Sequence, residues 1–250
     1  MAKPRFGQHF LIDLSVAHRE VEYANLTKDD IVLEIGPGKG VITRLLAQKA
    51  KQVIAIEIDK RLVENLEKNL SKNVTLISGD VLSVDFKKIP QFTKIVSNLP
   101  FKISSPITFK LMELSFIKAI LIYQKDFAER LVAPPGKKEY SHLTVGVSYK
   151  AHCRILEEVN RCSFSPEPNV DSSIVEIIPR QKPMFKVENE QFFFKLTRQL
   201  FNHRRKKIRY IIKKLYGDYE QLPYLDQRIG ELTPEQIGEL SNALWQLKLK

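Results

Sequence analysis

Cysteine is scarce in this 250-residue chain, which contains only Cys153 and Cys162. Two thiols at this spacing exclude a disulfide framework and a cysteine-based zinc site, and they indicate a reducing compartment. We therefore expect a cytoplasmic protein. The histidines also lack the spacing of metal ligands, so we expect no bound metal.

Long apolar runs are missing as well. The longest, such as residues 119–123, fall far short of the ~20 residues that a helix needs to cross a bilayer. Residues 1–8 contain no apolar segment typical of a secretory signal. We therefore expect no membrane partner.

Acidic residues are too few to balance the basic ones. The chain has 29 Asp and Glu against 40 Lys and Arg, which gives a net charge of +11 and a pI near 9.5. An excess of this size predicts a polyanionic partner, and nucleic acid is favoured because a membrane segment is missing. With 43% hydrophobic and 28% charged residues, the composition excludes a fibrous or largely disordered protein.

The order of apolar runs predicts an α/β fold. Short β-branched runs alternate with longer segments of helical spacing, a pattern typical of a parallel sheet with helices on both faces. Two later runs, residues 145–156 and 172–178, are expected to complete the sheet as antiparallel strands. The five runs that predict parallel strands are residues 31–35, 52–57, 74–77, 94–97 and 118–123.

The sequence changes character after Pro179. Residues 181–250 hold 14 basic and 8 acidic side chains, with apolar residues at helical spacing. We expect residues 1–180 to form one domain and residues 181–250 a small α-helical domain, with Pro183 marking the linker.

A glycine-rich turn follows the first predicted strand, in the segment from Glu34 to Gly40. Glycines there allow a sharp bend and a close approach of a ligand to free amides at a helix N-terminus. Glu57, at the end of the second strand, is placed to accept hydrogen bonds from a ribose diol. The G-x-G-x-G spacing differs from the dinucleotide fingerprint, and a simple tight turn remains an alternative.

Two further strand ends carry polar side chains. Asp80 follows the third strand, where a carboxylate can accept a hydrogen bond from an adenine amino group or simply cap a turn. The tetrad Asn98-Leu99-Pro100-Phe101 follows the fourth strand. Asn98 can accept hydrogen bonds from an exocyclic amine, and Phe101 offers a flat face for an unstacked base.

These motifs together resemble class I S-adenosylmethionine-dependent methyltransferases that act on adenine, and within them the KsgA-type ribosomal RNA adenine dimethyltransferases. The resemblance also rests on the N-terminal segment 5–13, on Ile103-Ser104-Ser105-Pro106 and on residues 164–172. It implies a Rossmann-like methyltransferase sheet and transfer of methyl groups to the N6 atoms of two adjacent adenosines. Those adenosines lie in the 3′-terminal hairpin of small-subunit rRNA, and their methylation belongs to ribosome biogenesis.

The resemblance also assigns residues to roles. The catalytic positions are Asn98, Leu99, Pro100, Phe101 and Phe164, with Phe164 expected to cover the target base. The cofactor-binding positions are His9, Leu11, Gly36, Glu57, Asp80 and Asn98. His9 replaces the Asn of many relatives, and Ser141 replaces a Gly.

A run of basic residues lies in the C-terminal segment. On a helix, these charges would contact several RNA phosphates, although a solvated surface is the alternative. We expect the protein to bind the small ribosomal subunit as a monomer. The residues expected to bind RNA are Arg204, Arg205, Lys206, Lys207 and Arg209.

Three other functions remain open. The same fold could methylate a large-subunit adenosine or DNA, or it could serve as a non-catalytic RNA-binding assembly factor. A dinucleotide-dependent oxidoreductase is disfavoured by the glycine spacing and by the Asn98 tetrad.

Overall fold

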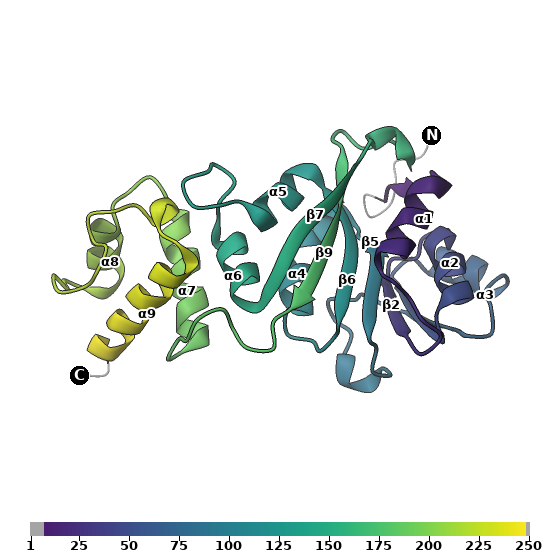
Figure 1. The fold of residues 1–250 in the computed structure, drawn as a ribbon, viewed down its shortest axis with the longest axis horizontal. Coiled ribbons are helices and arrows are strands. Elements are labelled where there is room, and N and C mark those ends of the chain that lie inside the picture. Colours follow the sequence, from purple (N-terminus) through teal and green to yellow (C-terminus); the bar gives the residue numbers. More distant parts are fainter. Residues whose placement is uncertain (1–7, 249–250) are drawn as a thin grey trace. The chain divides into compact units, whose positions relative to one another are not determined.

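The computed structural model describes residues 8–248 (Figure 1). The chain forms two compact units: one comprises Met1–Ala128 with Cys153–Pro179, and the other Glu129–His152 with Arg180–Lys250. Within residues 8–248, no helix is long and apolar enough to span a membrane.

A seven-stranded sheet is the centre of the first unit, with strand order β4-β3-β2-β5-β6-β9-β7. The neighbours from β4 to β6 pair in parallel, and β9 pairs antiparallel with β6. This pairing confirms the predicted parallel strands and the antiparallel return. The strands are β2 (Ile31–Ile35), β3 (Gln52–Glu57), β4 (Val74–Ser78), β5 (Lys94–Asn98), β6 (Lys118–Gln124), β7 (Ala151–Val159) and β9 (Ser172–Pro179).

Helices cover the sheet because alternate strand residues point to opposite faces. Apolar side chains of α1 (Leu14–Tyr23) and α2 (Val41–Lys49) form one buried cluster with strand residues such as Val32, Val53 and Ile120. Figure 1 draws α4 (Ser104–Leu111) on the opposite side of the sheet from these two helices. The helix α3 (Lys60–Glu67) follows β3 and is capped by Asp59, whose carboxylate accepts the Arg61 N–H.

A short two-stranded sheet brings the N-terminal segment against a later part of the chain. Strand β1 (Phe10–Leu11) pairs antiparallel with β8 (Phe164–Ser165). The segment before β8 includes the 3-10 turn η4 (Arg161–Ser163), and η2 (Phe86–Lys88) and η3 (Phe101–Ile103) follow β4 and β5. The pairing of β1 with β8 fixes the described part of the N-terminal segment next to the sheet.

The second unit is helical, with a core rich in aromatic residues. For example, the Tyr149 ring contacts the rings of Phe185, Phe193 and Phe194. The unit's helices are the C-terminal part of α5 (Lys125–Val132), α6 (His142–Lys150), α7 (Glu190–Asn202), α8 (Ile208–Tyr216), the 3-10 turn η5 (Ile229–Glu231) and α9 (Pro234–Lys248).

Two predictions about this region need correction. Residues 145–150 are helical, not part of a strand, because α6 buries Val145 and Tyr149 in the same core as the C-terminal helices. For the same reason, residues 129–152 belong to the second unit, whereas we predicted one domain for residues 1–180. Ser141, one of the two departures from the resemblance, lies at the start of α6, where its N–H donates to Thr144 Oγ1 at 3.0 Å.

The basic run is also not one helix. Residues 203–207 form turns between α7 and α8, and α8 begins only at Ile208. The reason is burial: Ile208, Ile211 and Ile212 pack in the core and set where the helix starts.

Candidate active site

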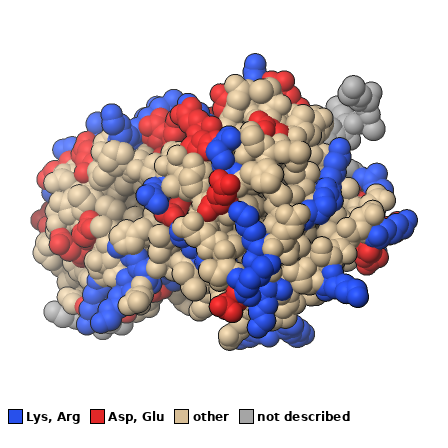
Figure 2. Space-filling model, turned by 45° about the vertical axis from the view of Figure 1, so that its right-hand side comes forward, with Lys and Arg blue, Asp and Glu red and all other residues tan. Residues whose placement is uncertain are grey.

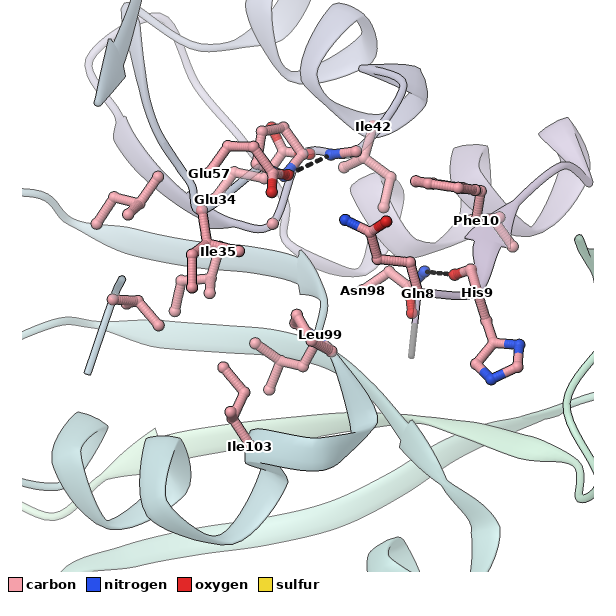
Figure 3. A pocket seen from close by; sticks show the side chains of 18 of the residues that line it. Gln8, His9, Phe10, Glu34, Ile35, Ile42, Glu57, Asn98, Leu99 and Ile103 are labelled. Carbon is pink, nitrogen blue, oxygen red and sulfur yellow. Dashed lines mark hydrogen bonds between the residues drawn. The ribbon is translucent and has the colours of Figure 1, made fainter. Parts of the chain in front are cut away.

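A cavity of about 260 Å³ lies at the carboxyl ends of β2, β3, β4 and β5 (Figure 3). Parallel strands end at the same edge of a sheet, so residues distant in sequence meet there. Gly36, Glu57, Asp80 and Asn98 all line this cavity, each from a different strand end. The structure thus brings together the four positions that we predicted at the strand ends.

The glycine-rich turn forms one wall of the cavity. Gly36 and Gly38 have φ angles of 70° and 59°, a left-handed conformation that favours glycine. A Cβ at Gly38 would lie 2.9 Å from Cδ1 of Phe10, and one at Gly36 would lie 3.3 Å from Cγ of Pro100. The glycines of this turn are therefore packed closely against Phe10 and Pro100, which line the same cavity.

Glu57 is buried beside the glycine turn, and each of its carboxylate oxygens accepts one backbone hydrogen bond. Oε2 accepts from the Gly38 N–H at 3.1 Å, and Oε1 accepts from the Asp59 N–H at 2.9 Å. Burial raises the pKa of Glu57, and these two N–H groups oppose the rise. Since a carboxylate has about four acceptor sites, Glu57 retains capacity for a diol.

Two more carboxyl groups are buried in the first unit, and one of them, Glu34, lines the cavity. Burial raises the pKa of Glu34 to about 8, and the negative charge of Glu57 adds to the rise. Burial also raises the pKa of Glu20, on α1, well above its usual value, with a further contribution from Glu34. Among the described residues, neither oxygen of Glu20 and only one of Glu34 has a hydrogen-bond partner. Glu34 is therefore mainly protonated at neutral pH, and burial shifts the pKa of Glu20 in the same direction.

Asn98 presents an unused acceptor to the cavity. Its Nδ2 donates to the backbone carbonyl of His9 at 3.2 Å, as Figure 3 shows. Its Oδ1 is buried and accepts no hydrogen bond from any described residue. A buried acceptor without a partner is unfavourable by about 1–3 kcal/mol, so this oxygen is suited to an N–H donor from a ligand.

Aromatic rings lie beside Asn98. The His9 ring stacks on Phe101 with a centroid distance of 5.5 Å, and His9 Nδ1 lies 2.6 Å from the carbonyl oxygen of Pro166. Since a carbonyl only accepts, Nδ1 carries the proton and donates it. Phe164 meets Phe101 edge-on at 6.3 Å, is 2% exposed and does not line the cavity. Phe164 therefore lies against the Phe101 ring, outside the lining of the cavity.

The remaining predicted site residues fall into two groups. His9, Leu11, Leu99, Pro100 and Phe101 line the cavity together with the four strand-end residues, and exposed Asp80 accepts the Leu82 N–H at 2.9 Å. The residues predicted to bind RNA lie in the second unit.

The five residues predicted to bind RNA differ in how far their charges are already engaged by other groups of the protein. Arg204 donates to the backbone carbonyls of Lys137 and Lys138. Lys207 and Arg209 both pair with Asp226. Within residues 8–248, Arg205 and Lys206 form no ion pair, and the Lys206 ammonium lies 5.6 Å from the Tyr210 ring centroid. Arg205 and Lys206 are thus the most available of the five.

Some cavity residues were given no individual role in the sequence analysis: Gln8, Phe10, Lys39, Ile58 and Lys102. Each is adjacent in sequence to a residue that we did single out, so chain proximity was the available signal. Their side-chain directions depend on turns whose geometry the sequence pattern does not specify.

The cavity fits the cofactor that the resemblance implies. Glu57 lines the cavity beside the glycine turn and has free acceptor capacity for a ribose. Apolar side chains such as Ile58, which is 43% exposed, offer a surface to a flat base. The residues present therefore suit an adenosine-containing ligand such as S-adenosylmethionine.

Known proteins resemble this chain over nearly its full length. The family model described as ribosomal RNA adenine dimethylase matches residues 1–246. A protein of Methanosarcina acetivorans, described as probable ribosomal RNA small subunit methyltransferase A, is 44% identical, and the match covers 97% of this chain and 94% of that protein. A protein of Thermococcus onnurineus with the same description is 42% identical over 96% of this chain and 91% of its own.

Solved structures share the fold. A dimethyladenosine transferase from Plasmodium falciparum superposes with a TM-score of 0.79 at 30% identity, covering 93% of this chain and 96% of its own. The 23S rRNA methyltransferase ErmE gives a TM-score of 0.70 at 27% identity, covering 95% and 100%. These likenesses confirm the predicted Rossmann-like methyltransferase fold: the chain belongs to the ribosomal RNA adenine dimethylase family, whose enzymes take their methyl groups from S-adenosylmethionine.

Proposed function

We propose that this protein dimethylates the N6 amino groups of two adjacent adenosines in the 3′-terminal hairpin of small-subunit rRNA, as a step of ribosome biogenesis. The family supports adenine in rRNA as the target. The descriptions of the archaeal relatives name the small subunit, which favours that subunit over the large one.

The unpartnered Oδ1 of Asn98 is the observation that carries the proposal. An exocyclic amine has two N–H donors, and Oδ1 can accept one of them. Because the amide nitrogen is held by the His9 carbonyl, the carboxamide cannot rotate without losing that hydrogen bond. Asn98 therefore orients the amine so that its lone pair points toward the methyl donor.

The cofactor would be held by the residues that surround the glycine turn. Glu57 would accept hydrogen bonds from the ribose hydroxyls, and Asp80 would accept one from the adenine amine. The main chain at Gly36, Leu11 and His9 would contact the rest of the cofactor. When bound, S-adenosylmethionine supplies an electrophilic methyl group. Alignment is then the main task of the protein, and no strong general base is required at Asn98.

Phe101 and Phe164 would act as a pair on the target base. Adenine must leave its stack before its N6 can enter the cavity, which costs a few kcal/mol. Stacking on Phe101 offsets about 1–3 kcal/mol of this cost. Phe164 is buried edge-on against Phe101 and would hold that ring in place.

The partner in this proposal is the small ribosomal subunit. A monomer of this protein would bind it in the cytoplasm, with no membrane involved. Arg205 and Lys206 in the second unit would contact rRNA phosphates, which contribute affinity but no sequence choice.

The test is incubation with methyl-labelled S-adenosylmethionine and unmethylated small subunits, followed by mapping of the label. Label on two neighbouring adenosines of the 3′-terminal hairpin is the expected result. Label on one large-subunit adenosine would show that the proposed substrate is wrong. Cofactor binding without transfer to any RNA would favour a non-catalytic assembly factor.

A further inference from the structure

Two lysines that line the cavity have no role in the function proposed so far. Lys39 belongs to the glycine turn after β2, and Lys102 follows Phe101 in η3 after β5. Both side chains are exposed. Within residues 8–248, neither ammonium group forms an ion pair with a carboxylate.

Surface charge by itself does not single out these lysines. Lys and Arg side chains are spread over the face that Figure 2 shows, with Asp and Glu between them. Lys39 and Lys102 differ because they line the cavity that holds Asn98 and because they come from two separate strand-end turns.

Local packing positions Lys39. Its ammonium lies 5.1 Å from the ring centroid of Phe10, a distance typical of a cation–π contact. Phe10 in turn packs against Gly38, where a Cβ would come within 2.9 Å of its ring. The turn that shapes the cavity thus also sets the place of the Lys39 charge.

Lys102 is positioned by its neighbours in sequence. Phe101 and Ile103, on either side of it, both line the cavity and are partly buried. Since η3 is a short 3-10 turn capped by the Ser104 N–H on the Phe101 carbonyl, its backbone is fixed where β5 ends. An exposed lysine at this point lies beside the entry of the cavity.

The charge of the cavity explains why cations are needed there. Glu57 and Asp80 line it, whereas Glu34, which also lines it, is mainly protonated and adds no negative charge. An adenosine inserted into such a cavity leaves its flanking phosphates outside, and these acidic groups repel them. Two ammonium groups at the entry offset that repulsion and neutralise phosphates directly.

We infer that Lys39 and Lys102 form a phosphate clamp that holds the RNA backbone on either side of the target adenosine. This inference rests on the proposed function, since it requires a polynucleotide substrate. The clamp acts on position as well as affinity, because a fixed backbone limits how the flipped adenine can approach Asn98. Lys39 and Lys102 are thus positioning residues for the reaction.

The experiment compares the wild type with a K39A/K102A variant and a matched K49A/K72A variant. Lys49 and Lys72 are exposed lysines of the same unit that do not line the cavity, so the second variant removes the same charge elsewhere. The affinity for unmethylated small subunits is measured over a series of salt concentrations, and the affinity for S-adenosylmethionine by calorimetry.

We expect K39A/K102A to lower the slope of log affinity against log salt by about 1.4, the value for two contacts to single-stranded phosphates. RNA affinity at low salt should fall roughly tenfold, and K49A/K72A should do neither. A K39R/K102R variant should restore the slope. Unchanged cofactor affinity in K39A/K102A shows that the protein is folded.

Two results would overturn the inference while leaving the proposed function intact. One is an unchanged salt slope in K39A/K102A. The other is a loss of cofactor affinity with an unchanged slope, which would assign the lysines to the carboxylate of the cofactor. Failure of the wild type to methylate any rRNA would instead refute the proposed function, and the clamp with it.

Discussion

The two units of this protein treat buried polar groups in opposite ways. In the first unit, side-chain atoms of Glu20, Glu34 and Asn98 are buried without a hydrogen-bond partner among the described residues. Among the described residues of the second unit, no buried side-chain oxygen or nitrogen lacks a partner: for example, Tyr140 donates to the Leu232 carbonyl and Thr197 to the Phe193 carbonyl. Unsatisfied groups are unfavourable for folding, and Glu34 and Asn98 line the cavity, where a ligand can reach them. The difference indicates that the first unit carries the reactive site, whereas the second unit is packed for stability.

The largest expected effect comes from removing the unpartnered acceptor itself. Asn98→Ala should lower the single-turnover rate of methyl transfer at least roughly 100-fold, because the amine loses its orientation. Glu57→Ala, the matched change on the neighbouring wall, should mainly weaken cofactor binding. Calorimetry with S-adenosylmethionine separates the two. Equal losses of cofactor affinity in both variants would contradict this division of roles.

The buried carboxyl groups predict how stability depends on pH. The folded state holds the pKa of Glu34 at about 8, above its ordinary value of 4.5. The stability that neutral Glu34 contributes is fully present below pH 4.5 and is lost as the pH rises through 8. The reason is that Glu34 loses its proton at a lower pH in the unfolded state than in the folded state. Glu20 acts in the same direction.

Glu34→Gln should therefore flatten the decline of unfolding free energy between pH 5 and pH 9, by an amount on the order of 4 kcal/mol. Urea unfolding at several pH values measures it. Glu190→Gln, in the second unit, is the control, since Glu190 is partly exposed and ion-paired with Lys150. A wild type equally stable at both pH values would refute the prediction.

Two glycine substitutions distinguish the effect of backbone strain from the effect of a steric clash in the cavity wall. Gly38→Ala and Gly136→Ala both place a side chain at positive φ, which costs about 1–2 kcal/mol of folding free energy. Only at Gly38 does the new Cβ meet a neighbour, Phe10, whereas Gly136 has open space around it. Thermal unfolding should show losses in both variants. Cofactor affinity should fall only in Gly38→Ala, and an equal fall in both would mean that the cavity is not involved.

The smallest effect concerns the basic residues of the second unit. Replacing Arg204, Arg205, Lys206 and Lys207 by Ala should flatten the salt dependence of RNA binding. Most of that change should already occur in R205A/K206A, since Lys207 is paired with Asp226 and Arg204 with backbone carbonyls. Filter binding at several salt concentrations tests this. An unchanged slope in the fourfold variant would make the run a solvated surface.

The sheet and the strand-end residues were predictable from the sequence because buried β-branched runs leave few alternatives. Runs such as 31–35 and 52–57 are mostly apolar, and parallel strands place their ends at one edge. The same logic located Glu57 and Asn98 in one site. Prediction failed at residues 145–150, where an apolar segment serves a helical core as well as it would a strand.

Side-chain direction was the other limit of the sequence. Nothing in the motif around Phe164 indicates that its ring meets Phe101 edge-on, and nothing in the basic run indicates that Asp226 pairs with two of its members. Both depend on contacts between residues far apart in the chain. Such contacts follow from tertiary packing and leave no local pattern.

The pairing of β1 with β8 has a consequence for how the protein is made. His9 and Pro166, joined by a hydrogen bond, are 157 residues apart. At about 5–20 residues per second, the ribosome needs roughly 8–30 s to synthesise the interval between them. During that time the cavity lacks the wall that His9, Phe10 and Leu11 provide. A nascent chain that has not yet reached Pro166 therefore cannot assemble the complete site, and the enzyme becomes competent only after β8 has been synthesised.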